Sequence, residues 1–488
     1  MPRSSAFRAT ATKVAVTVSV VGLATFGFRY AEAHDSGHEA ADTQSVAAFV
    51  GVTVIPMDRQ RVIENQTVVV RDGRIASVGP AASIAVPSDA VRIDGRGRFL
   101  MPGLAEMHAH VLGPQAANSE ELNRDIMFLY VANGITTIRA MLGAPNQLVL
   151  RDRLQRGEVL GPTMYVAAPS LNGQSARDPQ TAERLVREHK AAGYDLLKIH
   201  PGLSRAAYDA IVRSAREAGM TWAGHVSGQI GVEHILDTKQ STIDHLDGYI
   251  EAAASPEMRQ AMASPSSGVS LPQAWRSVTG ERMRELARRT RAAGTWNVPT
   301  MFLWESFFMP LSPDEWSTRE EMKYAPKQWV TNWSNQKRQR IQMDAQNNVA
   351  PADAALLISL RRRMLKYLVD EGAPLLMGTD SPQMFNVPGF ALHRELKVMA
   401  ESGLTPYQVL ESGSRNVGAY VAADLKKDGN FGTITVGSRA DLVLLDANPL
   451  EDLANLAKRS GVMVRGRWVP RDEIDRGLAT LAARYAQQ

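Results

Sequence analysis

The sequence predicts an α/β protein built as a (β/α)8 TIM barrel, with a small β-sandwich domain formed from both chain ends. Three observations support this prediction. Short apolar runs alternate with amphipathic stretches over residues 99–425, reactive side chains end several of these runs, and strand-like segments lie on both sides of the region. Alternating strands and helices are typical of parallel barrels, and 488 residues suit a barrel with a second module.

The N-terminal segment 1–33 has the pattern of a secretory signal peptide. Arg3, Arg8 and Lys13 give a basic start, an apolar run covers 14–28, and Ala31-Glu32-Ala33 fits a cleavage site. The apolar run is short for a membrane span. We therefore expect a periplasmic or secreted protein without stable membrane association after cleavage, with an uncleaved anchor as the alternative.

Strand-like segments at both ends predict the small β-sandwich. Residues 47–98 alternate in polarity, and Asp72-Gly73 after an apolar run is a hairpin signal. Residues 426–475 resume this pattern, for instance at 441–445. We expect the two stretches to form one supporting domain.

The barrel region contains eight expected strands separated by helical stretches. The strands are expected at 104–110, 135–140, 163–169, 195–200, 220–225, 241–246, 296–300 and 373–379. Helical stretches include 181–192, 204–218, 281–293, 355–371 and 391–402. Short apolar runs followed by longer amphipathic stretches match the repeating unit of such a barrel.

An aromatic insertion, residues 301–354, separates the last two expected strands and holds half of the chain's eight tryptophans. An insertion after a barrel strand emerges at the mouth where active sites lie. We therefore expect Trp304 and Phe307, which directly follow the seventh strand, to contact a substrate. This segment has two possible roles: it forms a lid or a pocket wall, or its aromatic residues only fix the insertion to the barrel.

Six residues able to take part in metal binding end the expected strands: His108, His110, Lys198, His225, His245 and Asp380. The carboxyl ends of barrel strands converge on one mouth, so residues far apart in sequence can form one site. His108 and His110 are two positions apart and share a strand face. Two imidazoles on one face suit one divalent ion.

Composition excludes several other classes of site. The chain has no cysteine, which excludes disulfides, thiolate ligands and a cysteine nucleophile. No G-x-S-x-G elbow is present, which argues against a serine hydrolase. The segment 1–33 has four basic side chains against Glu32, so it carries +3 of the net charge of +4. The triplet Arg361-Arg362-Arg363 is expected to be a solvated helix face, so we expect no nucleic-acid partner.

The motifs together resemble the amidohydrolase superfamily, most of all its two-metal members with a lysine on the fourth strand, such as the prolidase-like and Xaa-dipeptidase-like enzymes. The motifs are MPGLAEMHAHV at 101–111, YDLLKIHPG at 194–202, WAGHVSG at 222–228, TIDHLDGY at 242–249 and LLMGTDSP at 375–382. The resemblance covers nearly the whole chain after the segment 1–33. One departure is Glu106, where the family usually has aspartate; a carboxylate there can still orient an imidazole.

The resemblance implies two divalent metal ions, with Zn²⁺ as the first choice. It places His108 and His110 on the first strand, Lys198 on the fourth, His225 on the fifth, His245 on the sixth and Asp380 on the eighth. An ammonium group has no lone pair for a metal. The resemblance therefore implies that Lys198 is modified to a carbamate that bridges the ions, the alternative being an unmodified lysine beside a single ion.

The implied activity is hydrolysis of a linear amide by a metal-held hydroxide, in a dipeptide or N-acyl amino acid with a bulky hydrophobic or aromatic group. Asp380 then has the catalytic role of relaying a proton to the leaving amine. Arg139, at the end of the second strand, binds a substrate carboxylate or forms an ion pair. His200 contacts the substrate or supports the site.

Two other functions are open. One is cyclic-amide hydrolysis or deamination, as in imidazolonepropionase-like enzymes, which often lack the fourth-strand lysine. The other is an inactive extracytoplasmic binding protein, which the complete ligand set disfavours. The expected partner is a small-molecule amide, and a homo-oligomer is open.

Overall fold

The structure, a computed structural model, describes residues 46–263 and 268–488. The predicted signal peptide, residues 1–33, lies outside the described residues. All described residues belong to one unit, Ser36–Gln488. Within them, no helix combines the length and the apolar character needed to cross a membrane.

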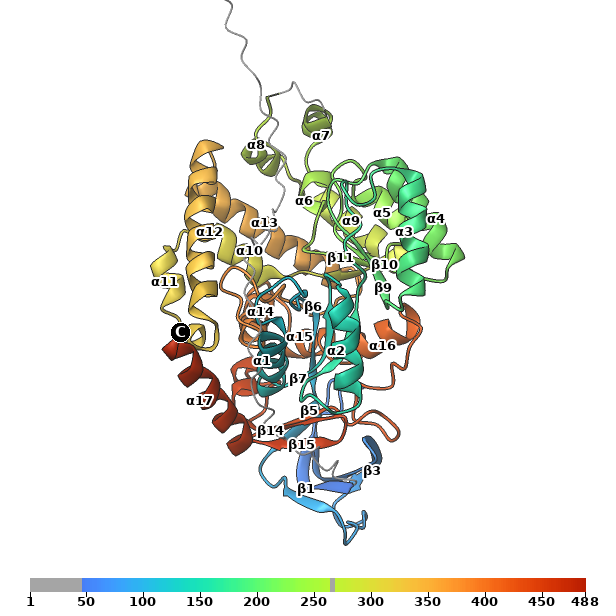
Figure 1. Cartoon of the computed structure of the whole chain (residues 1–488), viewed down its shortest axis with the longest axis vertical. Coiled ribbons are helices and arrows are strands. Elements are labelled where there is room, and N and C mark those ends of the chain that lie inside the picture. Colours follow the sequence, from blue (N-terminus) through green and yellow to red (C-terminus); the bar gives the residue numbers. More distant parts are fainter. Residues whose placement is uncertain (1–45, 264–267) are drawn as a thin grey trace, which may run out of the picture. The chain divides into compact units, whose positions relative to one another are not determined.

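Strands from both chain ends join in one mixed eight-stranded sheet (Figure 1). The strands are β1 (Val46–Val54), β2 (Ile63–Arg71), β3 (Arg74–Pro80), β4 (Val91–Asp94), β5 (Phe99–Pro102), β13 (Leu442–Leu445), β14 (Arg459–Val464) and β15 (Arg467–Pro470). β13 pairs antiparallel with β5, with Leu444 opposite Leu100. The C-terminal strands therefore continue the N-terminal sheet edge to edge, and the second, facing sheet of the predicted sandwich is not confirmed among the described strands.

The predicted hairpin at Asp72-Gly73 is confirmed. β2 and β3 pair antiparallel, with Arg71 opposite Arg74. Asp72 and Gly73 both have positive φ, 48° and 75°, as a two-residue turn of this handedness requires.

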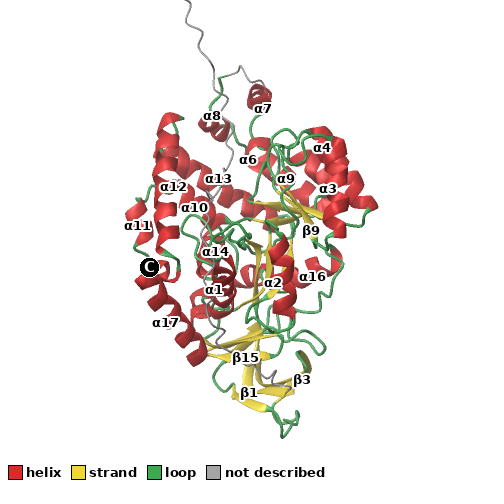
Figure 2. Cartoon of the chain, in the orientation of Figure 1, coloured by secondary structure: helices red, strands yellow, loops and turns green. Residues whose placement is uncertain are grey.

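The expected barrel strands form two parallel sheets. One contains β6 (Leu104–Ala109), β7 (Ile135–Ala140) and β8 (Thr163–Val166); the other contains β9 (Leu196–Ile199), β10 (Thr221–Gly224), β11 (Thr242–Asp244) and β12 (Trp296–Val298). Every residue of β6, β7 and β9 is buried, because helices cover these sheets (Figure 2). The mixed α/β fold is thus confirmed, while the described strands form no closed eight-stranded ring.

Isolated parallel bridges link the two sheets. On one side, Ala167 bridges to Leu196 between β8 and β9. On the other side, the segment after α13 (Pro351–Asp370) bridges to β12 through Asn297–Leu375 and to β6 through Ala109–Ser381. The stretch 373–379, expected as the eighth strand, is not a regular strand. The Met377 N–H donates to Ser412 O outside the sheet, which interrupts the ladder that a strand needs.

The five predicted helical stretches are confirmed as α3 (Pro179–Ala191), α4 (Arg205–Glu217), α9 (Gly280–Ala293), α13 (Pro351–Asp370) and α14 (Phe390–Glu401). α4 shows why they form. The Ser204 side chain caps its first turn by accepting from Ala207 N, and Tyr208, Ile211 and Ala215 bury one face, which is the spacing of an amphipathic helix.

Further helices lie between these elements. They are α1 (Ser119–Ala132), α2 (Pro145–Gln155), α5 (Val232–Thr238), α6 (Tyr249–Ala252), α7 (Pro256–Ala263), α8 (Leu271–Arg276), α15 (Pro406–Ser412), α16 (Arg415–Ala423), α17 (Arg471–Gln487) and the 3-10 turn η2 (Leu453–Ala457).

The aromatic insertion is helical and packs against the loop that follows Asp380. It contains α10 (Met301–Phe308), α11 (Pro313–Ser317), the 3-10 turn η1 (Glu320–Tyr324) and α12 (Lys327–Gln346). Trp316 is fully buried and stacks on Phe385 at 5.7 Å between ring centroids. A second ring from the insertion, Trp333, lies edge-on to Phe385. The insertion therefore braces the segment that carries Asp380.

Candidate metal centre

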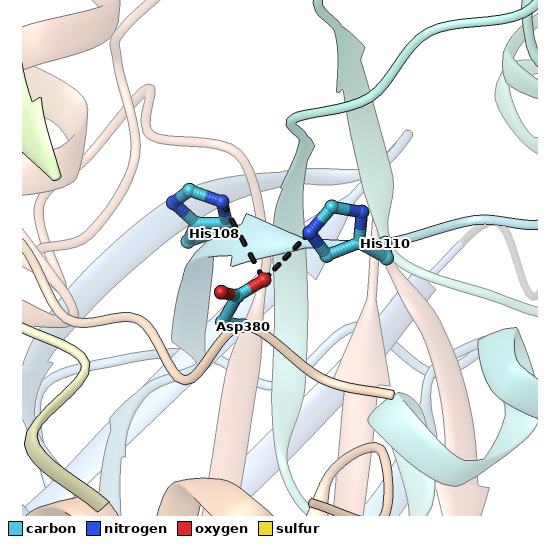
Figure 3. Close-up of side chains that lie close together, drawn as sticks. All are labelled: His108, His110 and Asp380. Atoms are coloured by element: carbon cyan, nitrogen blue, oxygen red, sulfur yellow. Dashed lines mark ion pairs between the residues drawn. The ribbon is translucent and has the colours of Figure 1, made fainter. Parts of the chain in front are cut away.

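Two histidines at the end of β6 lie close to an aspartate that directly follows the stretch 373–379. His110 Nε2 lies 2.6 Å and His108 Nε2 lies 3.6 Å from Oδ1 of Asp380 (Figure 3). One donor atom from each of these three side chains lies within 4.8 Å of the others. Imidazole and carboxylate donors at this spacing suit a divalent ion.

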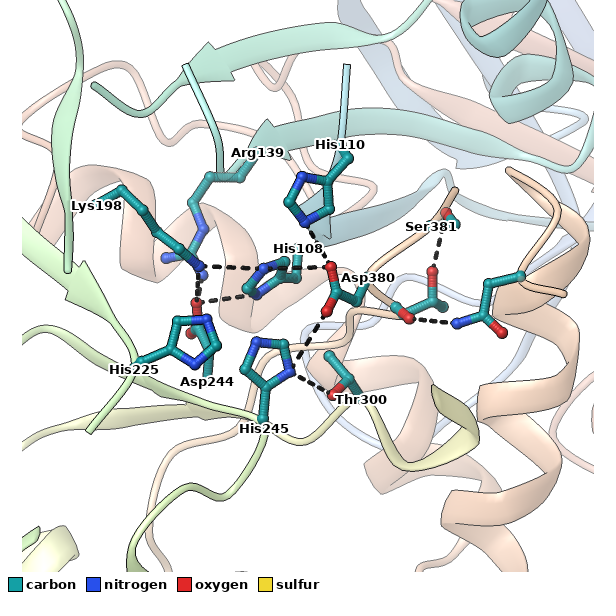
Figure 4. Close-up of polar contacts among 12 residues, drawn as sticks. His108, His110, Arg139, Lys198, His225, Asp244, His245, Thr300, Asp380 and Ser381 are labelled. Carbon is teal, nitrogen blue, oxygen red and sulfur yellow. Dashed lines mark hydrogen bonds and ion pairs between the residues drawn. The ribbon is translucent and has the colours of Figure 1, made fainter. Parts of the chain in front are cut away.

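The remaining predicted ligands surround the same point (Figure 4). The His245 ring lies 4.5 Å from the His108 ring and 4.6 Å from the His225 ring, measured between centroids. Lys198 Nζ lies 3.2 Å from His108 Nε2. The structure thus brings all six predicted ligands together, although they come from strands far apart in sequence.

Unusual backbone conformations hold two of these ligands in place. His245 and Asp380 have φ of 63° and 65°, a region that residues other than glycine rarely adopt. Each is fixed by a backbone hydrogen bond, from His245 N to Val298 O at 2.7 Å and from Asp380 N to His108 O at 2.8 Å. Such strain is typical of functional sites.

Three of the histidines have Nδ1 next to a protein oxygen. The partner atoms are Asp244 Oδ2 for His108 at 3.0 Å, Asp247 Oδ2 for His225 at 2.8 Å and Thr300 Oγ1 for His245 at 2.8 Å. A partner at one ring nitrogen orients the ring and leaves the other nitrogen for a metal. Sequence reasoning missed these partners, although Asp244 and Asp247 lie inside the same short motif as His245.

Arg139 forms an internal ion pair, one of the two roles that the sequence left open. It is fully buried. Its Nη2 lies 3.3 Å from Asp244 Oδ1, its Nη1 donates to the Tyr420 hydroxyl at 2.8 Å, and its Nε donates to Met107 O at 2.7 Å. The donors of this guanidinium are thus taken by protein acceptors, and it holds Asp244 beside His108.

Glu106 connects the first strand to the stretch that carries Asp380. Its Oε1 accepts hydrogen bonds from His108 N at 2.9 Å and from Thr379 N at 2.8 Å. Burial raises the pKa of the Glu106 carboxyl to about 8. The side chain thus supports the centre through backbone contacts, whereas the sequence analysis expected it to orient an imidazole.

Burial sets the charge state of the centre. It lowers the pKa of His108 and of His245 well below the usual value, and nearby Lys198 and the neighbouring histidines add to this. Neutral imidazole is the form that binds metals. Burial also lowers the pKa of Lys198, which favours the neutral amine that can react with carbon dioxide.

Orphaned polar atoms show that the residues fit a metal ion. His245 Nε2 and Asp380 Oδ1 are buried and have no hydrogen-bond partner of suitable geometry among the described residues. Leaving such an atom unsatisfied costs about 1–3 kcal/mol. Metal ions held by the cluster would supply partners for atoms of this kind.

The predicted substrate contacts differ in their surroundings. The His200 ring lies 4.7 Å from the His225 ring, and its Nδ1 lies 2.5 Å from Ser170 Oγ, so it stands beside the cluster. Phe307 is partly buried. The Trp304 ring stacks on Phe308 at 5.6 Å and lies under the Arg361 guanidinium at 3.7 Å. Protein groups thus already occupy the stacking positions of Trp304.

Arg361 itself is a correction to the sequence analysis. It is 3% exposed, whereas the arginine triplet was expected to be a solvated face. It lies four residues after the buried Leu357 on α13, which places it on the inward side of that helix. Its Nη2 donates to the carbonyl of His245.

Comparison with known proteins agrees with the fold. Residues 99–469 match the model of the amidohydrolase family. Imidazolonepropionase of Stenotrophomonas maltophilia is 36% identical over 19% of this chain and 24% of the relative, and adenine deaminase of a Ruegeria species is 25% identical over 46% and 38%. The matched regions thus span well under half of these curated relatives.

Solved structures share the fold over most of the chain. Bottromycin amidohydrolase superposes with a TM-score of 0.67 at 21% identity, covering 91% of this chain and 92% of that one. A Xaa-Pro dipeptidase with bound methionine superposes with a TM-score of 0.63 at 17% identity, covering 87% and 100%.

The buried histidine–aspartate cluster lies inside the matched region and could hold a divalent metal ion. The chain belongs to the amidohydrolase family, whose model covers most of its length.

Proposed function

We propose that this protein is an exported amidohydrolase that cleaves a linear amide bond in a dipeptide or an N-acyl amino acid. The observation that carries the proposal is the position of Lys198. This lysine is fully buried, with Nζ 3.2 Å from His108 Nε2 and 3.8 Å from Asp244 Oδ2. A buried lysine at the centre of a ligand set fits a carbamate bridge between two ions better than a structural ion pair, because Asp244 already pairs with Arg139.

Six residues would hold the two ions. His108, His110, His225, His245, Asp380 and a carboxylated Lys198 would hold two divalent ions, and their nitrogen and oxygen donors favour Zn²⁺. When bound, the ions would supply Lewis acidity and lower the pKa of a water molecule.

Asp380 is the residue placed to move a proton. Its Oδ1 lies 2.6 Å from His110 Nε2 and its Oδ2 lies 3.7 Å from His245 Nδ1. The carboxylate is 5% exposed, so bulk water competes little for it. In the proposed reaction it accepts a proton from the attacking water and delivers it to the leaving amine.

The proposal also includes the domain organisation and the export of the protein. The bridges at Ala167, Ala109 and Asn297 support one closed (β/α)8 barrel over residues 99–425. We propose that 47–98 and 426–475, which share one sheet, form the β-sandwich beside it. The basic start and short apolar run of the segment 1–33 support export to the periplasm or the medium.

Cyclic-amide hydrolysis or deamination is the second candidate, because curated relatives carry the names imidazolonepropionase and adenine deaminase. The central lysine favours the linear amide. An inactive binding protein is disfavoured by the complete and closely spaced ligand set.

A substrate panel tests the proposal. Metal-reconstituted enzyme is assayed on N-acetyl-L-phenylalanine, N-acetylglycine, leucyl dipeptides, 4-imidazolone-5-propanoate and adenine. The proposal expects turnover of linear amides, with the phenylalanine compound preferred. Because Phe307 is partly buried on α10, the helix that follows β12, Phe307→Ala should weaken catalysis on that compound more than on N-acetylglycine. Turnover of the cyclic compounds alone would favour the second candidate.

A further inference from the structure

Two buried N–H groups without an acceptor lie next to each other beside the metal centre. They are Nε of Arg361 on α13 and Nε1 of Trp304 on α10, and neither has a hydrogen-bond partner among the described residues. The guanidinium carbon lies 3.7 Å from the centroid of the Trp304 ring. Buried donors are nearly always paired in native structures, so two adjacent orphans indicate a missing acceptor.

The charge of Arg361 also has no direct counterion. Among the described residues, no carboxylate oxygen lies within ion-pair distance of its guanidinium, and its hydrogen bond goes to the carbonyl of His245. Asp247, Glu251 and Glu395 act on it only from longer range. The next residue, Arg362, pairs directly with Glu305 and Glu401. A buried cation without a close partner is costly, which points to an anion supplied from outside the chain.

Arg361 contacts the backbone of the metal ligand His245, and Trp304 lies one helical turn after Thr300, which also contacts it. The Arg361 contact is to the carbonyl of His245, and the Thr300 hydroxyl lies 2.8 Å from His245 Nδ1. The stack of Trp304 on Phe308, with an interplanar angle of 10°, holds the indole in one orientation. A group bound by these donors would therefore lie near His245.

We propose that Arg361 and Trp304 bind the carboxylate of the substrate, which is the free carboxylate of an N-acyl amino acid or of the C-terminal residue of a dipeptide. This inference rests on the proposed hydrolysis of a linear amide. A guanidinium matches a planar carboxylate in shape and charge, and the indole supplies one more donor. A neutral carbonyl would satisfy a donor but would leave the buried charge unpaired.

A matched pair of substrates tests the assignment. Metal-loaded enzyme is assayed on N-acetyl-L-phenylalanine and on N-acetyl-L-phenylalaninamide, which lacks the negative charge. Arg361→Gln should lower kcat/KM for the acid by about 10²-fold, as expected for a lost charged hydrogen bond, mainly through KM, with little effect on the carboxamide. Trp304→Phe keeps the ring and should cost the acid about fivefold, as expected for a neutral hydrogen bond. Arg363→Gln, an exposed position on the same helix, is the control and should change neither.

The assignment would be overturned if kcat/KM fell equally for both compounds, or if kcat/KM for the acid were unchanged in both variants. Water molecules would then be the partners of the two donors. If Arg361→Gln does not fold, Trp304→Phe decides alone. If wild-type enzyme hydrolyses neither compound, the proposed function fails, and calorimetry with 3-phenylpropanoate and 3-phenylpropan-1-ol still tests the site. The acid should then lose about tenfold in affinity with Arg361→Gln while the alcohol does not. Equal affinity of the acid for both proteins would reject the site.

Discussion

The Nδ1 atom of His108 lies 3.0 Å from Oδ2 of Asp244, while the other oxygen of this carboxylate lies 3.3 Å from the Arg139 guanidinium. All three side chains are buried. Burial alone would raise the pKa of Asp244, but the Arg139 guanidinium and the hydrogen bond from the Thr242 hydroxyl act against it and the pKa lies below its usual value, so the carboxylate stays ionised. Asp244 thereby directs His108 Nε2 toward Lys198 and Asp380.

Asp244→Asn should weaken metal binding by about 10–100-fold, the usual effect of losing a group that orients a metal-bound imidazole. Competition against a chromophoric chelator measures the affinity. Asp237→Asn, at an exposed position, is the control. Unchanged metal affinity in a folded Asp244→Asn protein would show that the His108 contact has no role in positioning.

Lys198→Ala should lose most of the metal and the activity, because the bridging oxygen ligand would be gone. Added short carboxylic acids should partly restore both, since they can enter the cavity that the lysine leaves. Metal analysis and rate measurements on the same samples check this. A variant that keeps one ion and full activity would mean that Lys198 does not bridge.

The sequence predicts that the candidate ligands lie close together, because most of them lie at or near the end of a strand. His108, Lys198, His225 and His245 follow short buried runs, and parallel strands deliver their ends to one place. Their supporting partners could not be predicted in the same way. The pairing of Arg139 with Asp244 joins two strands through side-chain geometry, and no spacing rule contains that geometry.

The long helix α13 shows another limit of pattern reading. Arg361 follows the helical spacing of buried residues, but its type predicts a surface position. The prediction of a regular eighth strand at 373–379 was wrong. The hydrogen-bond ladder of the sheet is interrupted there, because Met377 N donates to Ser412 O. The aromatic residues of the insertion did not predict that it is helical.

Asp380→Asn should keep the fold and most of the metal but lower kcat by about 10²–10⁴-fold, the usual contribution of a proton-transfer group. The amide is similar in size to the carboxylate and accepts protons poorly. Turnover near the wild-type rate, with the metal content confirmed, would rule out the proton-relay role.

Trp316→Ala should destabilise the protein by about 3–5 kcal/mol, as expected for truncating a buried tryptophan. Because Trp316 stacks on Phe385 in the loop after Asp380, kcat should fall as well. Urea unfolding followed by circular dichroism measures the first effect. Trp329→Ala, at a partly exposed position, should cost less, and equal costs would argue against a specific brace.

The central claim is a two-metal amide hydrolase, and titration of metal-stripped enzyme with Zn²⁺ tests it most directly. The rate of N-acetyl-L-phenylalanine hydrolysis is followed as the ratio of zinc to protein rises. The account predicts that the rate reaches its maximum at two equivalents of Zn²⁺ per chain. A maximum at one equivalent, or hydrolysis that persists without metal, would contradict it.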